Sequence, residues 1–268
     1  MSTTRAGWRH FPRTLCLVLA LGSAGRSEAF DIPLAGGQLD PLIEFVPPPP
    51  GSPDEVRFTR DGMLVRQGAD IAGRSADTCG FKSLLSASGD FEIALEITCL
   101  RLEAPRAGWG QGLVFSVLLD DAPQTMLKLS RLAAPDQGQL CQVEISARHG
   151  GEPIYRPHSI DLRHGRLVIA RQGEEAVFLI DDGQAQEVLE RFPCPAQDTC
   201  GVEGWCTRQQ RDNTTAEFLI HRLHFRADRF FAYPVPTKSW FSWWKFAIGA
   251  QIMLVLGLLV VLARRRGK

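Results

Sequence analysis

Residues 89–98 read GDFEIALEIT, and their side chains alternate between apolar and polar at every second position. The apolar set consists of Phe91, Ile93, Leu95 and Ile97. Because successive side chains of a β-strand point to opposite faces, this alternation predicts a strand with one face on a core and the other toward water.

Shorter segments of the same kind follow, separated by turn-forming runs such as Asp121-Ala122-Pro123 and Asp181-Asp182-Gly183. The expected strands cover residues 113–119, 125–132, 140–147, 166–171, 176–180, 186–192 and 216–225. No long helical periodicity interrupts residues 55–228. Many short strands with regular turns predict an all-β domain, a sandwich or a barrel.

Three segments carry a resemblance to a known superfamily. They are the GDFEI opening of the long strand at 89–93, the run GRLVIARQG at 165–173 followed by Val177-Phe178-Leu179, and the closing strand 216–227. Together they resemble the concanavalin A-like (laminin-G-like) jelly-roll superfamily, and within it a bacterial extracytoplasmic branch. The resemblance implies an antiparallel two-sheet jelly-roll sandwich over residues 55–228 that binds a glycan or protein partner on a concave face or at loop tips. Lectins, glucanases and structural modules share this fold, so the fold alone does not select a function.

The first 29 residues have the anatomy of a signal peptide. Arg5, Arg9 and Arg13 precede an apolar run, Leu15 to Gly22, that is too short to span a bilayer. Small residues at Ser27 and Ala29 predict cleavage before Phe30. An uncleaved anchor or a disordered tail is the alternative.

The carboxyl-terminal end predicts a single transmembrane helix. Residues 246–263 contain no ionisable side chain, and eighteen helical residues cover about 27 Å, close to the thickness of a hydrocarbon core. A stalk with an aromatic belt at 229–245 precedes the helix, and the basic tail 264–268 follows it. The basic tail places that end in the cytoplasm and predicts a single-pass cell-membrane protein whose bulk is extracytoplasmic. A buried core helix and a cleaved sorting signal are the alternatives.

Residues 30–54 are expected to be irregular, because they end in the proline-rich run 47–53. Proline lacks the backbone donor that a sheet or a helix needs, so this run predicts a stiff spacer.

The exported part contains six cysteines: Cys79, Cys99, Cys141, Cys194, Cys200 and Cys206. In an oxidising compartment an even number favours three disulfides, with fifteen pairings open to sequence reasoning. A loop bridge within residues 194–206 and a bridge between Cys99 and Cys141 are the first guesses. Zinc is the alternative, but the even spacing of the last three cysteines is wider than structural zinc sites use, and no metal is expected.

Catalysis is not expected. Glucanases of the superfamily carry two glutamates with an aspartate between them on one strand face, and here Glu92 and Glu96 flank Ala94 instead. His221 and His224 are three residues apart on an expected strand, which puts them on opposite faces and unable to share a metal ion. The chain is therefore expected to be a binding module and not an enzyme, and no cofactor is expected.

Ligand-binding candidates are Trp109 and Gln111, in the segment GWGQG at 108–112, and Trp205, between two cysteines in an expected loop. An exposed indole can stack on a sugar ring or contact a protein, although burial in the core is the competing interpretation for both tryptophans. Thirty basic and thirty acidic residues cancel, so no nucleic-acid partner is expected. A structural or assembly subunit of an envelope complex, or a glycosidase-like enzyme, are the alternative functions.

Overall fold

The structure, a computed structural model, describes residues 27–36, 40–69, 79–83, 85–121, 124–147, 152–195, 198–208 and 213–232. Regular structure within these ranges consists of β-strands. In chain order they are β1 (Glu28–Pro33), β2 (Ile43–Val46), β3 (Glu55–Phe58), β4 (Met63–Gln67), β5 (Cys79–Ser83), β6 (Leu85–Leu102), β7 (Gln111–Leu119), β8 (Thr125–Ala134), β9 (Gly138–Ala147), β10 (Ile154–His158), β11 (His164–Gln172), β12 (Glu175–Asp181), β13 (Gln186–Pro193), β14 (Thr199–Arg208) and β15 (Ala216–Ala232).

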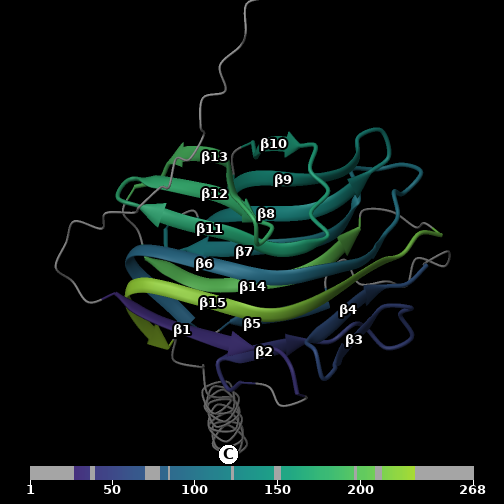
Figure 1. The fold of residues 1–268 in the computed structure, drawn as a ribbon, viewed down its shortest axis with the longest axis horizontal. Helices are drawn as coiled ribbons and strands as arrows, with labels where there is room; N and C mark the ends of the chain where they lie inside the picture. Colours follow the sequence, from purple (N-terminus) through teal and green to yellow (C-terminus); the bar gives the residue numbers. More distant parts are fainter. Residues whose placement is uncertain are drawn as a thin grey trace, which may run out of the picture.

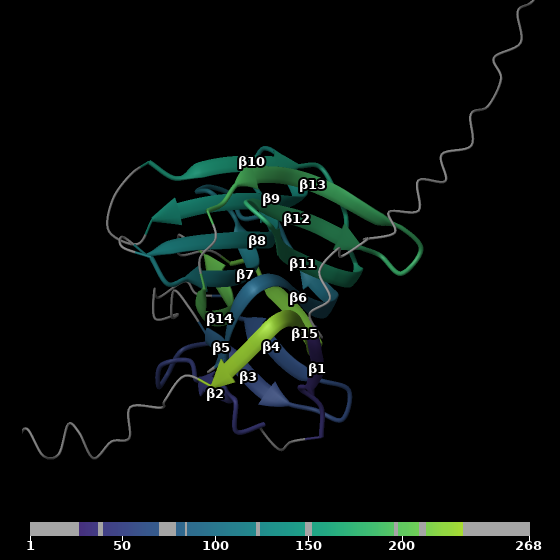
Figure 2. The same ribbon diagram turned by 90° about the vertical axis from the view of Figure 1, so that its left-hand side faces the viewer.

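The strands form two sheets, and every strand pair recorded is antiparallel. Sheet A has the order β13-β12-β11-β6-β15-β4-β3, with β1 also beside β15, and sheet B has the order β10-β9-β8-β7-β14-β5-β2. The strand order can be followed in Figure 1, and the view in Figure 2 shows the sheets as two layers. The expected all-β, two-sheet architecture is confirmed.

The long strand predicted from residues 89–98 is the centre of sheet A. β6 pairs with β11 on one side and along most of its length with β15 on the other. Its apolar side chains Phe91, Ile93, Leu95 and Ile97 are all buried in the core between the sheets. Sheet B contributes its own alternate residues to this core, for example Leu113, Phe115 and Val117 of β7.

The segment expected to be irregular contains two strands. β1 pairs with β15 in sheet A, and β2 pairs with β5 in sheet B, so both strands belong to the sandwich. The proline-rich run that follows β2 has no regular structure and carries the chain across to β3 in sheet A. It is therefore a crossover inside the domain and not a spacer in front of it, because β2 before it already completes the edge of sheet B.

At the carboxyl-terminal end the structure differs from the prediction, and most of the predicted terminal segments lie outside the described residues. β15 continues to Ala232, so the first residues assigned to the stalk are part of the sheet. Most of the predicted signal peptide, the rest of the stalk, the transmembrane helix and the basic tail lie outside the described residues. Within the described ranges, no helical segment of bilayer-spanning length and apolarity is found.

The expected disulfides are not found in the part of the chain that the structure describes. For one pairing within residues 194–206, the structure gives a physical reason why no bridge forms. Cys200 and Cys206 both lie on β14, where six residues of extended chain separate Cα atoms by about 20 Å, whereas a disulfide requires less than about 7 Å. Cys99 and Cys141 lie on strands of different sheets, β6 in sheet A and β9 in sheet B.

Candidate binding groove on sheet B

A groove of about 590 Å³ lies on the outer face of sheet B. Its walls come from β7, β8, β9, β10 and β14, from the loop before β7 and from the β8–β9 turn. The lining residues are Gly108, Trp109, Val114, Lys128, Ser130, Leu132, Ala134, Pro135, Asp136, Gln137, Gln142, Glu144, Tyr155, Trp205 and Thr207. This volume is in the range of small-molecule and oligosaccharide sites.

Strand register builds the floor of the groove. Trp205 on β14 is paired with Val114 on β7, Val114 with Ser130 on β8, and Ser130 with Gln142 on β9. Because directly paired residues point to the same face, these four side chains form one row across sheet B. The two neighbours of Trp205 in sequence face the core instead: Cys206 belongs to the buried core, and a Cβ on Gly204 would meet the ring of the buried Phe81.

Three aromatic side chains border the groove, and each comes from a different part of the chain. Trp109, in the loop before β7, is 41% exposed, and Tyr155, on the edge strand β10, is 48% exposed. Trp205 is half-buried on β14. The two tryptophans singled out in the sequence therefore line one groove, although Trp205 lies on a strand and not in the loop that was expected.

Gln111 does not line the groove. Its side chain is fully buried, and Nε2 donates a hydrogen bond to the backbone oxygen of Glu103 at 2.7 Å. The structure therefore corrects the expectation that Gln111 contacts a ligand: this side chain holds the base of the loop that carries Trp109.

A second row across sheet B is made of charged and polar side chains. In register order it runs Tyr155, Glu144, Lys128, Ser116, Glu203, Lys82 and Glu44. Lys128 Nζ lies 2.7 Å from Glu144 Oε1, and both side chains are mostly buried in the groove floor. Lys82 Nζ lies 3.0 Å from Glu203 Oε1 farther along the row, beyond the lining of the groove. Opposite charges thus alternate along the row and pair locally.

The hydroxyl of Tyr155 remains protonated at neutral pH. Partial burial raises the pKa of Tyr155 above its ordinary value, and the carboxylate of Glu144 on the paired strand raises it further. A protonated phenol can donate a hydrogen bond and accept one, as a sugar hydroxyl can. A carbohydrate site needs an apolar platform and directional polar contacts. The aromatic rings of the groove can supply the platform, and groups such as the phenol of Tyr155 can supply the polar contacts.

The glutamates considered for catalysis lie elsewhere. Glu92 and Glu96 are on β6 in sheet A, away from the groove. Glu96 Oε2 lies 3.2 Å from His224 Nε2, and His224 Nδ1 lies 2.8 Å from Asp31 Oδ1 of β1. This cluster attaches the amino-terminal strand to the sheet.

The prediction that His221 and His224 face opposite sides is wrong. His221 Nε2 lies 2.8 Å from Thr98 Oγ1, and His224 contacts Glu96, two residues from Thr98 and hence on the same face of β6. The pairing of β15 with β6 shifts by one residue between Ile220 and Arg222, and this bulge turns both rings to the outer face of sheet A. Even so, no group of three His, Cys, Asp or Glu side chains able to hold a metal ion occurs in the part of the chain that the structure describes.

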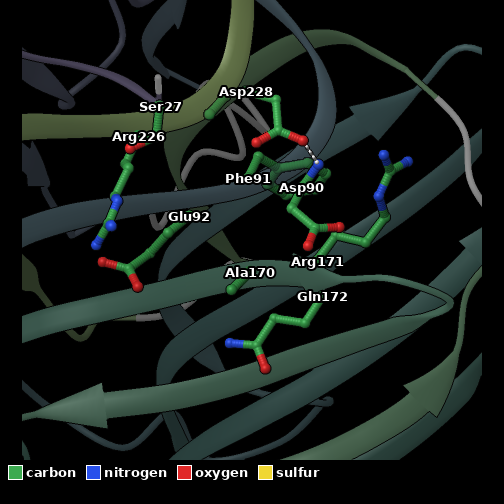
Figure 3. A pocket seen from close by; sticks show the side chains of 10 residues that line it. Ser27, Asp90, Phe91, Glu92, Ala170, Arg171, Gln172, Arg226 and Asp228 are labelled. Carbon is green, nitrogen blue, oxygen red and sulfur yellow. Dashed lines mark hydrogen bonds between the residues drawn. The ribbon is translucent and has the colours of Figure 1, made fainter. Parts of the chain in front are cut away.

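A second pocket, on sheet A, measures only about 40 Å³ (Figure 3). Its polar groups hold a turn together: Asp228 accepts a hydrogen bond from the backbone nitrogen of Asp90 at 3.0 Å, and Asp90 accepts one from Gly173 at 2.7 Å. Arg171 donates to the backbone oxygen of Gly89. A space of this size is too small for a sugar ring.

Sequence reasoning missed Tyr155, Lys128 and Glu144 as groove residues. Lys128 and Glu144 sit on strands that were predicted, but their pairing depends on the register of β8 with β9. Tyr155 lies on β10, an exposed edge strand containing Pro157, whose composition gave no strand signal.

Comparison with solved structures shows the fold. A protein from members of the human gut microbiota that express endo-acting O-glycanases to initiate mucin breakdown superposes with a TM-score of 0.55, at 10% identity, over 74% of this chain and 98% of its own. A glycoside hydrolase family protein from Mycobacterium thermorestibile gives a TM-score of 0.51 at 13% identity, over 75% and 99% of the two chains. An immunostimulatory antigen and pseudo β-1,3-glucanase of Mycobacterium tuberculosis gives 0.51 at 12% identity, over 74% and 98%. At such identities the likeness supports the predicted jelly-roll, concanavalin A-like fold and does not extend to function.

Comparison by sequence identifies one family. Among curated proteins, no sequence matches this chain. A family profile described as the C domain of a protein of unknown function, DUF1583, matches residues 51–238, which cover β3 to β15. The chain therefore belongs to the DUF1583 C-domain family.

Proposed function

We propose that this protein is a membrane-anchored, extracytoplasmic binding module, of a bacterial branch of the jelly-roll superfamily, whose groove on sheet B holds a glycan chain. The observation that carries the proposal is the convergence of Trp109, Tyr155 and Trp205 on one groove. The rings of Trp109 and Tyr155 are exposed, and exposed aromatic side chains gathered at one place are typical of a binding surface. Polar groups suited to sugar hydroxyls lie beside them. The location rests on the predicted signal peptide, transmembrane helix and basic tail.

The groove favours binding without hydrolysis. Glycoside hydrolysis by the common mechanisms requires two carboxyl groups that flank the scissile bond, one of them acting as an acid. Two acidic residues line the groove, and Glu144 is held by Lys128 at 2.7 Å. Asp136, on the exposed β8–β9 turn, is the remaining carboxyl group of the lining. A single free carboxylate at the rim does not supply both roles.

Glycan binding is tested with the full chain, purified in a detergent without a sugar headgroup so that the detergent does not compete. A glycan array identifies ligands, and calorimetry measures their dissociation constants. If Trp205 covers roughly 80 Å² of a sugar face, Trp205→Ala removes about 2 kcal/mol of binding energy, about a thirtyfold loss of affinity. Trp109→Ala is expected to weaken binding in the same direction.

The matched control is Phe231→Ala, which removes an exposed aromatic ring of β15 on sheet A, outside the groove. Its affinity is expected to equal that of the unmodified chain. The proposal fails if no glycan binds, if Trp205→Ala binds as tightly as the unmodified chain, or if a bound glycan is hydrolysed.

A further inference from the structure

The charges in the groove are paired in a way that bears on which glycans it can accept. Lys128 is the one basic residue of the lining, and its Nζ lies 2.7 Å from Glu144 Oε1. Both side chains are about 15% exposed, so the ion pair is only weakly screened by solvent. The positive charge of Lys128 is therefore neutralised inside the groove and is not offered to a ligand.

The remaining charge of the lining is negative. Asp136 sits on the exposed β8–β9 turn at the rim of the groove, and it makes no ion pair with another residue among those the structure describes. With Lys128 and Glu144 cancelling, the lining carries a net charge of −1 from the two acids and one base. A uronate or sulfate group entering this groove meets a carboxylate and no uncompensated cation.

The uncharged lining points the same way. Gln142, half-buried on β9, and the hydroxyl of Tyr155 offer neutral donors and acceptors, and the three aromatic rings offer apolar faces. Hydroxyl groups of a neutral sugar can pair with the former while its C–H face packs on the latter. The groove thus offers neutral polar groups and apolar faces, and its lining has no uncompensated cation for an anionic substituent.

We infer that the ligand class is a neutral oligosaccharide: Glu144 neutralises Lys128, the cation of the groove lining, and the carboxylate of Asp136 repels an anionic polysaccharide. The inference rests on the proposed glycan binding and adds the selectivity of the same site. If Glu144 loses its charge, Lys128 becomes an available cation in the groove floor, and the exclusion is reversed.

The test uses the full chain and matched pairs of probes: a neutral oligosaccharide that binds, and the uronate obtained by oxidising its primary alcohols. We expect the uronate to bind at least about tenfold more weakly, the effect of one unit charge at roughly 6 Å in a medium between protein and water. Uronate binding equal to or tighter than that of the neutral partner overturns the inference while glycan binding itself stands. If neither member of any pair binds, the proposed function fails as well.

Two variants locate the effect. Glu144→Gln is expected to raise the affinity for the uronate, relative to that for its neutral partner, about tenfold at low salt, and to lose this gain at high salt. The matched control is Glu203→Gln, which breaks the Lys82–Glu203 pair of the same row outside the groove lining, and its uronate affinity is expected to stay unchanged. An unchanged far-ultraviolet circular dichroism spectrum shows that each variant is folded. The inference is overturned if Glu144→Gln leaves uronate affinity unchanged, or if Glu203→Gln raises it equally.

Discussion

Replacing Arg131 by methionine tests how the two sheets are joined at one corner. Arg131 on β8 is fully buried, and its Nε donates to the backbone oxygen of Leu162 at 2.9 Å. Nη1 donates to the backbone oxygens of Leu132 at 3.1 Å and Leu140 at 3.3 Å, and Nη2 lies 2.6 Å from Asp161 Oδ1. The guanidinium therefore attaches the segment between β10 of sheet B and β11 of sheet A to the β8–β9 hairpin.

The expected loss of stability follows from these contacts. Methionine fills similar space but leaves the buried oxygen of Leu162 without its donor, which costs about 1–3 kcal/mol, and removes two weaker charged hydrogen bonds. The carboxylate of Asp161 is 50% exposed, so water replaces most of its interaction. Allowing for apolar burial of the methionine, Arg131→Met is expected to lower the free energy of unfolding by about 2–4 kcal/mol.

The assay is urea unfolding followed by far-ultraviolet circular dichroism, with Asp161→Asn as the matched control. Because the Asp161 carboxylate is half exposed, its loss is expected to cost about 1 kcal/mol or less. A local readout is available, since the amide of Cys99 donates to the backbone oxygen of Arg163 at 2.7 Å and should exchange faster in Arg131→Met. The reasoning is refuted if Arg131→Met loses less than about 1 kcal/mol, or no more than Asp161→Asn.

Two further predictions concern the core. Gly204→Ala should lower the free energy of unfolding by about 1–3 kcal/mol, because the added Cβ would lie 2.4 Å from Cε1 of the buried Phe81 ring. The control is Gly201→Ala on the same strand, which should cost less because its Cβ would meet only an oxygen of Ser83 at 3.7 Å. Equal losses for the two variants in thermal or urea unfolding would contradict this prediction. Burial raises the pKa of the Cys141 thiol to about 11 from 9.0, so the fold favours the protonated thiol; its contribution is complete below pH 9.0 and is lost as pH rises through about 11. Unfolding measured across this alkaline window should show a decline that is shallower in Cys141→Ala, and an equal decline would count against the assignment.

A strand with strict alternation of apolar and polar side chains, such as β6, could be predicted from sequence. A strand whose core-facing positions include a glycine, such as β14, could not. Residues 89–98 present large apolar side chains at every second position, and β6 forms there. On β14 the inward positions include Gly204, where the ring of Phe81 from the paired strand fills the space that a side chain would occupy. The apolar group at this inward position therefore comes from the neighbouring strand β5, and the sequence of β14 does not show the alternation itself. For this reason the segment around Cys200 and Cys206 was predicted to be a loop.

The candidate site was only partly accessible to sequence reasoning. Trp109 and Trp205 could be chosen as residues, but their meeting on one groove depends on β14 pairing with β7. The ion pair of Lys128 with Glu144 depends in the same way on the register of β8 with β9. Local sequence does not contain these long-range pairings, because they are fixed by packing of the whole sandwich. The one-residue bulge that turns His221 to the face of His224 is a further example.

The most direct test of the account is protection of groove side chains by a bound glycan. The full chain is treated with an indole-oxidising reagent with and without a glycan that binds, and oxidation is measured peptide by peptide by mass spectrometry. We predict that saturating glycan slows oxidation of both Trp109 and Trp205, the two tryptophans that line the groove. Oxidation of both at the same rate with and without bound glycan would contradict the claim that sheet B carries the binding site.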